Sequence, residues 1–432
     1  MYDAVVQGAD EALTRRCGVK EALLVLKVGQ GHGMSPARLA RIDDFLEQKY
    51  VASGKMAGTL TLVARRGEIA HVGVRGFADR ERGVPVAADT IFRIYSMTKP
   101  ITSVAFMMLV EEGRVALEDP VHLYIPEWKD LCVYAGGIDK LGFQTTAPSR
   151  PMLVIDLLRH TAGLTYGFQN RTNVDAAYRA RGIGEIEKGT ITLGQMIAGL
   201  AELPLEFSPG EKWNYSVATD VLGYLIERIT GQAFEDFLRE RLLTPLGMVD
   251  TDFQARAGEE GRLAACYALT PNGRTILQDD PALSGFRERP AFVSGGGGLV
   301  GTAHDYLRFA QMLLNGGEAD GHRYISRKTL ELMTANHLPG GVDLPALSVS
   351  LFSEANYNGI GFGLGFATTM DPAKTMIAGS AGDYFWGGAA STAFWIDPAE
   401  DLICIFMTQL IPSSSYPVRR ELKTMVYAAI ED

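Results

Sequence analysis

The sequence is poor in the features that mark several common protein classes. It has only four cysteines in 432 residues, Cys17, Cys132, Cys266 and Cys404, and they form no C-x-x-C pair and no cysteine–histidine cluster. This spacing argues against a zinc site or a dithiol redox motif and predicts reduced, mostly buried thiols. We therefore expect no metal ion and no other cofactor.

Long apolar runs and runs of basic residues are also missing. No segment approaches the roughly 20 apolar residues of a membrane-spanning helix, and the N-terminus lacks the pattern of a secretory signal. The 51 acidic residues outnumber the 41 basic ones, and the resulting net charge of −10 opposes binding to nucleic acid. These absences predict a cytoplasmic protein that binds neither membranes nor nucleic acid.

A third absence concerns catalysis. Esterases of the α/β-hydrolase type carry their serine in a G-x-S-x-G turn, and the closest segment here, residues 378–382, begins with alanine. A Ser-His-Asp hydrolase of that type is therefore disfavoured. We interpret His160 as a structural residue at a helix end and not as a catalytic base.

The composition itself is that of an ordinary globular protein, with 47% apolar and 21% charged residues. Predicted strands lie near both ends of the chain and most predicted helices lie between them, so we expect an α+β fold. We assign residues 1–33 to an N-terminal extension, 34–116 and 281–432 to an α/β sheet domain, and 117–280 to a mostly helical domain. The active site is expected at the interface of the two domains.

Hydrophobic periodicity and cap residues predict the individual elements. Helices are expected over residues 36–50, 96–112, 152–160, 193–203, 217–230, 303–315 and 417–430. Strands are expected over residues 58–65, 68–76, 90–94, 359–366, 389–396 and 402–408. The interval from Pro126 to Met152 shows no clear period and is predicted to be a loop.

The most informative stretch is Ser96-Met97-Thr98-Lys99-Pro100, at the start of an apolar helix. Residues at i and i+3 share one helix face, so Lys99 can reach back over Ser96. Pro100 has no backbone N–H and is tolerated only near a helix start, where an anionic intermediate is favoured by the helix dipole. The pattern fits a serine nucleophile, and a simple helix cap fits it too.

Two further segments can supply the rest of a catalytic site. Tyr215 stands at the mouth of a predicted helix, where a phenol can act as acid or base or can simply pack against its neighbours. Trp386-Gly387-Gly388 precedes a predicted strand, and its glycines let a ligand approach the free amide of Ala389. A bulged strand with a buried tryptophan is the alternative for this segment.

Taken in order, the motifs resemble those of the serine β-lactamase and penicillin-binding superfamily. The closest resemblance is to its family VIII carboxylesterases, which are related to class C β-lactamases, and it spans roughly residues 36–430. It implies a β-lactamase-like fold, an antiparallel sheet flanked by helices beside a mostly helical domain. The motifs are Ser96 to Lys99, Leu158 to Leu164, Tyr215-Ser216-Val217, Gly295 to Gly298 and Trp386-Gly387-Gly388.

The chain departs from the lactamase pattern at two places. Val217 stands where the tyrosine motif of lactamases ends in asparagine, and Trp386-Gly387-Gly388 stands in place of their Lys-Thr-Gly. The Lys374-Thr375 pair nearby continues to Met376. Both departures remove polar groups that would hold a lactam, so the resemblance implies an ester substrate.

The resemblance also implies a role for each site residue. Ser96 attacks the ester, and Lys99 and Tyr215 together form the base, with the proton not assigned to either of them. The amides of Ser96 and Ala389 form the oxyanion hole. The substrate-binding residues are Trp386, Gly387 and Gly388, with Tyr166 and Asp220 also expected to face the cleft.

The expected function is hydrolysis of short- to medium-chain carboxylic esters, small molecules, through an acyl-enzyme on Ser96. A β-lactamase, a D-amino-acid peptidase or amidase, and an acyltransferase of the same superfamily are the alternatives. A non-catalytic binding relative is disfavoured, because Ser96, Lys99 and Tyr215 are all present.

Overall fold

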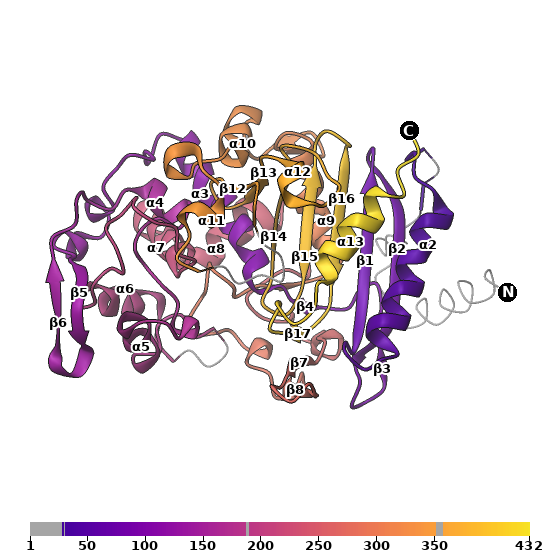
Figure 1. Cartoon of the computed structure of the whole chain (residues 1–432), viewed down its shortest axis with the longest axis horizontal. Helices are drawn as coiled ribbons and strands as arrows, with labels where there is room; N and C mark the ends of the chain where they lie inside the picture. Colours follow the sequence, from indigo (N-terminus) through magenta and orange to yellow (C-terminus); the bar gives the residue numbers. More distant parts are fainter. Residues whose placement is uncertain (1–27, 30, 187–189, 351–356) are drawn as a thin grey trace.

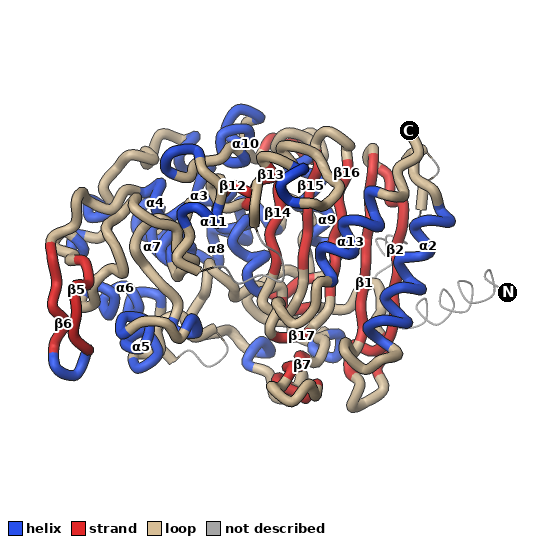
Figure 2. The backbone as a smooth tube through the Cα atoms, in the orientation of Figure 1, coloured by secondary structure: helices blue, strands red, loops and turns tan. Residues whose placement is uncertain are grey.

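The computed structural model describes residues 28–29, 31–186, 190–350 and 357–432. The predicted N-terminal extension, residues 1–33, and Cys17 therefore lie largely outside the described residues. Figures 1 and 2 show a mixed α/β architecture in which one large sheet stands beside a group of helices.

The large sheet has eight strands, and all of its paired neighbours are antiparallel. The order is β12-β13-β14-β15-β16-β1-β2-β3, so the N-terminal hairpin joins the C-terminal strands through the pairing of β1 with β16. The predicted α+β class with an antiparallel sheet is confirmed. The strands are β1 Gly58–Arg65, β2 Glu68–Asp79, β3 Val84–Pro85, β12 Ile360–Phe362, β13 Ala367–Thr369, β14 Tyr384–Gly387, β15 Ala393–Asp397 and β16 Leu402–Met407.

Helices cover both faces of this sheet. On one face, α2 (Pro36–Leu46) and α13 (Val418–Tyr427) pack Leu39, Ile42 and Leu422 against Trp395 and Phe406. On the other face lies α9 (Ala303–Leu314), whose Tyr306 ring is 4.9 Å from that of Phe394. Because both faces are covered, every residue of β1 is buried.

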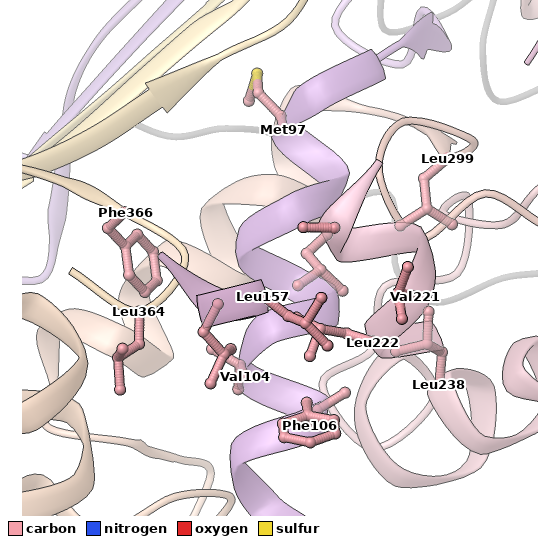
Figure 3. Packing of buried hydrophobic residues seen from close by; sticks show 14 of the residues in the cluster. Met97, Val104, Phe106, Leu157, Val221, Leu222, Leu238, Leu299, Leu364 and Phe366 are labelled. Carbon is pink, nitrogen blue, oxygen red and sulfur yellow. The ribbon is translucent and has the colours of Figure 1, made fainter. Parts of the chain in front are cut away.

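The helix α3 (Thr98–Glu111) lies at the centre of the molecule, and twelve of its residues are buried. Figure 3 shows Val104 and Phe106 of α3 among apolar residues of other helices, including Leu157 and Leu222. This packing holds the start of α3, and with it Ser96, in a fixed place. The surrounding helices are α4 Val154–Leu158, α5 Asn173–Ala180, α6 Leu193–Ala201, α7 Ala218–Thr230 and α8 Phe234–Leu238.

The remaining elements are short. The helices are α10 Arg327–Thr334, α11 Leu344–Leu347 and α12 Pro372–Thr375. The small sheets are formed by β4 Phe92–Arg93 with β9 Val300–Gly301, β5 Val133–Ile138 with β6 Gly142–Thr146, β10 Glu318–Ala319 with β11 His322–Arg323, and β17 Leu410–Ile411 with β7 Cys266–Leu269 and β8 Thr275–Asp279.

Three local predictions were wrong. The interval from Pro126 to Met152 contains the hairpin β5–β6, which protrudes at the edge of the molecule, so its residues alternate poorly between buried and exposed. Residues 359–366 do not form one strand, because the chain leaves β12 at Phe362 and turns back into β13. The strand predicted over residues 389–396 begins only at Ala393, since residues 388–392 form a tight turn.

Glycines alternate with larger residues along residues 359–366, and one of them admits another backbone. A Cβ atom on Gly363 would lie 2.0 Å from the carbonyl oxygen of Met333. The glycine is therefore required by the close approach of α10 to the turn between β12 and β13.

Candidate active site

Ser96 lies in a sharp turn between β4 and α3. Residues Tyr95–Met97 form one turn of 3₁₀-helix before α3 begins at Thr98, and Tyr95 has a φ of 42° in the left-handed region. Such a backbone conformation is strained for a tyrosine and is held by the packing around it. The turn leaves Ser96 half-buried at the wall of a cavity, with the helix start directly behind it.

Lys99 lies one helical turn beyond Ser96 and is buried, with only 2% of its surface exposed. Its Nζ is 3.3 Å from Ser96 Oγ and donates to Tyr166 Oη at 2.9 Å and to the Gly296 carbonyl oxygen at 2.6 Å. Burial lowers the pKa of Lys99 from 10.5 to about 7, although the charge of Asp220 acts in the opposite direction. A neutral amine is therefore accessible near neutral pH.

Tyr215 approaches Ser96 from the loop before α7. Its phenolic oxygen is hydrogen-bonded to Ser96 and accepts a hydrogen bond from Trp386 Nε1 at 3.3 Å. Burial raises the pKa of Tyr215 above its ordinary value, and the bonds to Ser96 and Trp386 only partly offset this. The phenol therefore stays protonated over the neutral range and faces the serine as a proton donor.

Asp220 and Tyr166 lie on the far side of Lys99. Asp220 Oδ1 accepts hydrogen bonds from Ser294 Oγ at 2.5 Å and from the Gly296 amide at 2.8 Å. Burial raises the pKa of Asp220, and the charge of Lys99 opposes that rise. Tyr166 lines the cavity, whereas Asp220, only 1% exposed, does not and lies behind Gly296.

The glycine run after Ser294 has a specific role that its sequence did not reveal. A Cβ atom on Gly296 would lie 2.7 Å from both Asp220 Oδ2 and Tyr166 Oη. Only glycine lets this backbone pass between the two side chains and place its carbonyl oxygen on Lys99. The resemblance includes Gly295 to Gly298 as a motif, but the sequence analysis assigned no role in the site to Gly296 or to Ser294.

The segment Trp386-Gly387-Gly388 ends β14 beside the turn that carries Ser96. A Cβ atom on Gly388 would lie 2.5 Å from the carbonyl oxygen of Ile94, two residues before Ser96. Ala389 follows at once and lines the same cavity as Ser96. The structure thus brings both predicted oxyanion amides to one wall. Lys374 and Thr375 belong instead to the short helix α12.

The cavity has a volume of about 780 Å³, which is ample for a small organic ligand. Most of its wall is aromatic or aliphatic. Its lining includes Tyr166, Phe168, Ile183, Ile186, Trp213, Tyr215, Ile360, Phe385 and Trp386, together with Ser96, Gly387, Gly388 and Ala389.

His160 lies close to this cluster without joining it. Its Nδ1 is 3.2 Å from Ser216 Oγ, and its ring packs against those of Trp213, Tyr215 and Phe362. Burial holds the pKa of His160 well below its usual range. These contacts are those of a packed structural residue.

Two kinds of feature are absent from the part of the chain that the structure describes. No group of three or more histidine, cysteine, aspartate or glutamate side chains there is arranged to hold a metal ion. No helix in those same residues is both long and apolar enough to cross a membrane.

Comparisons with known proteins identify a family and several similar proteins. The Beta-lactamase family model matches residues 44–425. Protein Rv1367c of Mycobacterium tuberculosis (strain ATCC 25618 / H37Rv) is 37% identical over 84% of this chain and 88% of its own, and Esterase EstB of Burkholderia gladioli is 31% identical over 90% and 95%. The solved structure of EstCE1, described as a hydrolase with promiscuous acyltransferase activity, has a TM-score of 0.75 and 26% identity and covers 92% of this chain and 99% of its own.

Proposed function

The chain belongs to the Beta-lactamase family, and from that premise we propose that it is a serine carboxylesterase that forms an acyl-enzyme on Ser96. The single observation that carries the proposal is the buried Lys99 amine, 3.3 Å from Ser96 Oγ, with a pKa lowered to about 7. A lysine placed in this way can take a proton from the serine at neutral pH.

The first half of the reaction acylates the enzyme. Ser96 Oγ attacks the ester carbonyl carbon while its proton passes to Lys99 Nζ, and the carbonyl electron pair moves onto the oxygen. The amides of Ser96 and Ala389 stabilise this oxyanion. When the intermediate collapses, the bond to the alcohol oxygen breaks and the leaving alkoxide takes a proton from Tyr215. The Lys99 ammonium, whose nitrogen lies 4.4 Å from the centre of the Tyr215 ring, then returns a proton to the phenolate.

The second half of the reaction releases the acid. A water molecule attacks the acyl carbon of the Ser96 ester, and Tyr215 and Lys99 together accept its proton. The second tetrahedral intermediate uses the same two amides, and its collapse returns the proton to Ser96 Oγ. Tyr166, which lines the cavity, accepts a hydrogen bond from Lys99 Nζ, and Asp220 holds the Gly296 backbone, whose carbonyl oxygen accepts another.

An ester fits the site better than a lactam. Trp386 occupies the position of the lysine in Lys-Thr-Gly, and its indole N–H donates to Tyr215 without adding a charge for a lactam carboxylate. The apolar lining suits an uncharged acyl chain of short to medium length. The name of Esterase EstB, which is 31% identical to this chain, also supports an ester as the substrate.

Acyl transfer is the second candidate, and the similarity to EstCE1, described as a hydrolase with promiscuous acyltransferase activity, favours it. A cavity of about 780 Å³ has room for an acceptor alcohol beside the acyl group. An alcohol that reaches the acyl-enzyme before water would produce a new ester in place of the free acid.

Four measurements test the proposal. Short-chain p-nitrophenyl esters should be turned over with a much higher kcat/KM than a chromogenic cephalosporin. A fluorophosphonate should leave a covalent adduct that mass spectrometry locates on Ser96, and Ser96→Ala should lose nearly all turnover while staying folded. Adding short alcohols and measuring the ratio of new ester to free acid separates transferase from hydrolase. A faster reaction with the cephalosporin, or unchanged activity in Ser96→Ala, contradicts the proposal.

A further inference from the structure

The turn after Trp386-Gly387-Gly388 is held by an arginine from a distant part of the chain. Arg419 stands in the first turn of α13, 31 residues beyond Gly388. Its Nη2 donates to the carbonyl oxygens of Gly388 at 2.8 Å and Thr392 at 2.9 Å. These carbonyls lie at the two ends of the turn over residues 388–392, so the guanidinium bridges its base.

We infer that Arg419 is a positioning residue that holds and polarises the peptide group between Gly388 and Ala389, so that the Ala389 N–H becomes a stronger oxyanion donor. The inference rests on the proposed function, in which Ala389 supplies one of the two donors. Arg419 also lines the cavity, but the inference assigns to it an effect on the reaction through the backbone, whereas a direct contact with the substrate would appear in KM.

The physical argument is that the Gly388 carbonyl and the Ala389 N–H belong to one conjugated amide. A cation bound to the amide oxygen favours the resonance form with positive charge on nitrogen, which makes the N–H a better hydrogen-bond donor. An oxyanion at Ala389 strengthens the bond from Arg419 in return. The gain therefore appears in the transition state, where charge develops, and not in the substrate complex.

The two glycines of the motif fit this arrangement. A Cβ atom on Gly387 would lie 2.6 Å from Arg419 Cζ and Nη2, so any side chain there would displace the guanidinium. Gly388 is required instead by the close approach of the Ile94 carbonyl. The first glycine thus makes room for Arg419, and the second brings the polarised peptide to the turn that carries Ser96.

The remaining bonds of the turn leave the Ala389 N–H available. The Gly388 amide donates to Thr392, the Ser391 amide to Gly388, and Ser391 Oγ to the Leu410 carbonyl. Among the described residues, none accepts a hydrogen bond from the Ala389 amide. Since Ala389 also lines the cavity, this donor is free to bind a substrate oxygen.

The test compares Arg419→Ala, Arg419→Gln and Arg419→Lys on p-nitrophenyl butyrate. Removal of a whole oxyanion donor costs about 10² to 10³ in rate, so weakening one should lower kcat by roughly tenfold in Arg419→Ala, with KM changed less than twofold. Arg419→Lys should retain more of the rate than Arg419→Gln, because it keeps the positive charge. Methylguanidinium added to Arg419→Ala should restore part of kcat, and urea, its uncharged analogue, should not.

A trifluoromethyl ketone, which forms a tetrahedral oxyanion on Ser96, gives the second readout. Its affinity should fall in Arg419→Ala by about the same factor as kcat, whereas a purely structural role would not link the two. Arg38→Ala is the matched control, because Arg38 also donates to a backbone carbonyl of this C-terminal segment, that of Ala428, far from the cavity. Its kcat should equal that of the wild type.

Several results would overturn the inference. They are an unchanged kcat in Arg419→Ala, a loss confined to KM, equal effects of methylguanidinium and urea, or an unchanged affinity for the ketone. If Arg419→Ala does not fold, the ordering of Arg419→Lys above Arg419→Gln decides the question. Failure of the proposed function looks different, since the wild type would then cleave no ester and form no adduct on Ser96.

Discussion

The indole N–H of Trp386 donates a hydrogen bond to the phenolic oxygen of Tyr215, across 171 residues of sequence. The two rings lie 5.5 Å apart and tilted by 51°. Trp386 therefore does more than line the cavity, because its indole N–H helps to fix the Tyr215 phenol beside Ser96.

Trp386→Phe tests this relationship, since it keeps an aromatic ring and removes the donor. A neutral hydrogen bond contributes about 0.5–1.5 kcal/mol, so we expect kcat to fall by roughly three- to tenfold with little change in KM. Steady-state kinetics on a p-nitrophenyl ester measures both constants. A rise in KM at constant kcat would show that Trp386 acts only on substrate binding.

The pH dependence of the reaction should report Lys99. Only the neutral amine can accept the Ser96 proton, and its pKa is lowered to about 7, so kcat/KM should rise with pH through about 7 and then level off. The measurement is kcat/KM in buffers from pH 5.5 to 9 at constant ionic strength. A flat profile, or a rise that begins only near pH 10, would contradict the role of Lys99 as base.

Asp220→Asn should move that profile. The charge of Asp220 raises the pKa of Lys99, so its removal should shift the midpoint to lower pH, even if the maximal rate falls. Ser294→Ala is the matched control, because it removes a hydrogen bond to the same carboxylate but keeps the acidic side chain of Asp220 in place. Equal midpoints in Asp220→Asn and the wild type would show that Asp220 does not act on Lys99 through its charge.

Arg93, in the strand before Ser96, should be important for stability. It is fully buried and bonded to Asp279, Ser284 and the Ala264 carbonyl. Removing one partner of such a buried network typically costs about 3–5 kcal/mol, so Arg93→Met should strongly lower the urea midpoint of unfolding. Arg239→Met, which breaks an exposed ion pair with Asp236, should cost about 1 kcal/mol or less of stability. Similar losses of stability in Arg93→Met and Arg239→Met would show that the buried network at Arg93 is no more important than an exposed pair.

Gly363→Ala should destabilise the protein, because the new methyl group would collide with the Met333 carbonyl. Overpacking of this kind costs about 1–3 kcal/mol. Gly261→Ala provides the comparison, since no atom lies within 4 Å of its Cβ position, and it should be neutral or slightly stabilising. Thermal or urea unfolding measures both, and equal stability of the two variants would exclude a steric requirement at Gly363.

Sequence reasoning succeeded where a structure depends on neighbours along the chain. The i to i+3 spacing of Ser96 and Lys99 and the Thr302 cap of α9 follow from helix geometry alone. The end of α7 at Gly231, with its φ of 75°, belongs to the same class. Sequence reasoning failed to predict the hairpin β5–β6 and the break that divides residues 359–366 into two strands. Tertiary packing and not periodicity determines those strands.

The candidate site shows the same division. From sequence alone, the chemical groups and their order along the chain could be listed, because the resemblance depends on Ser96, Lys99, Tyr215 and Trp386 as residue types. The lowered pKa of Lys99 could not be predicted from the sequence, because it depends on desolvation by side chains distant in sequence. The Gly296 carbonyl and Arg419 escaped notice for the same reason, since each acts through a backbone atom that only the folded chain brings near.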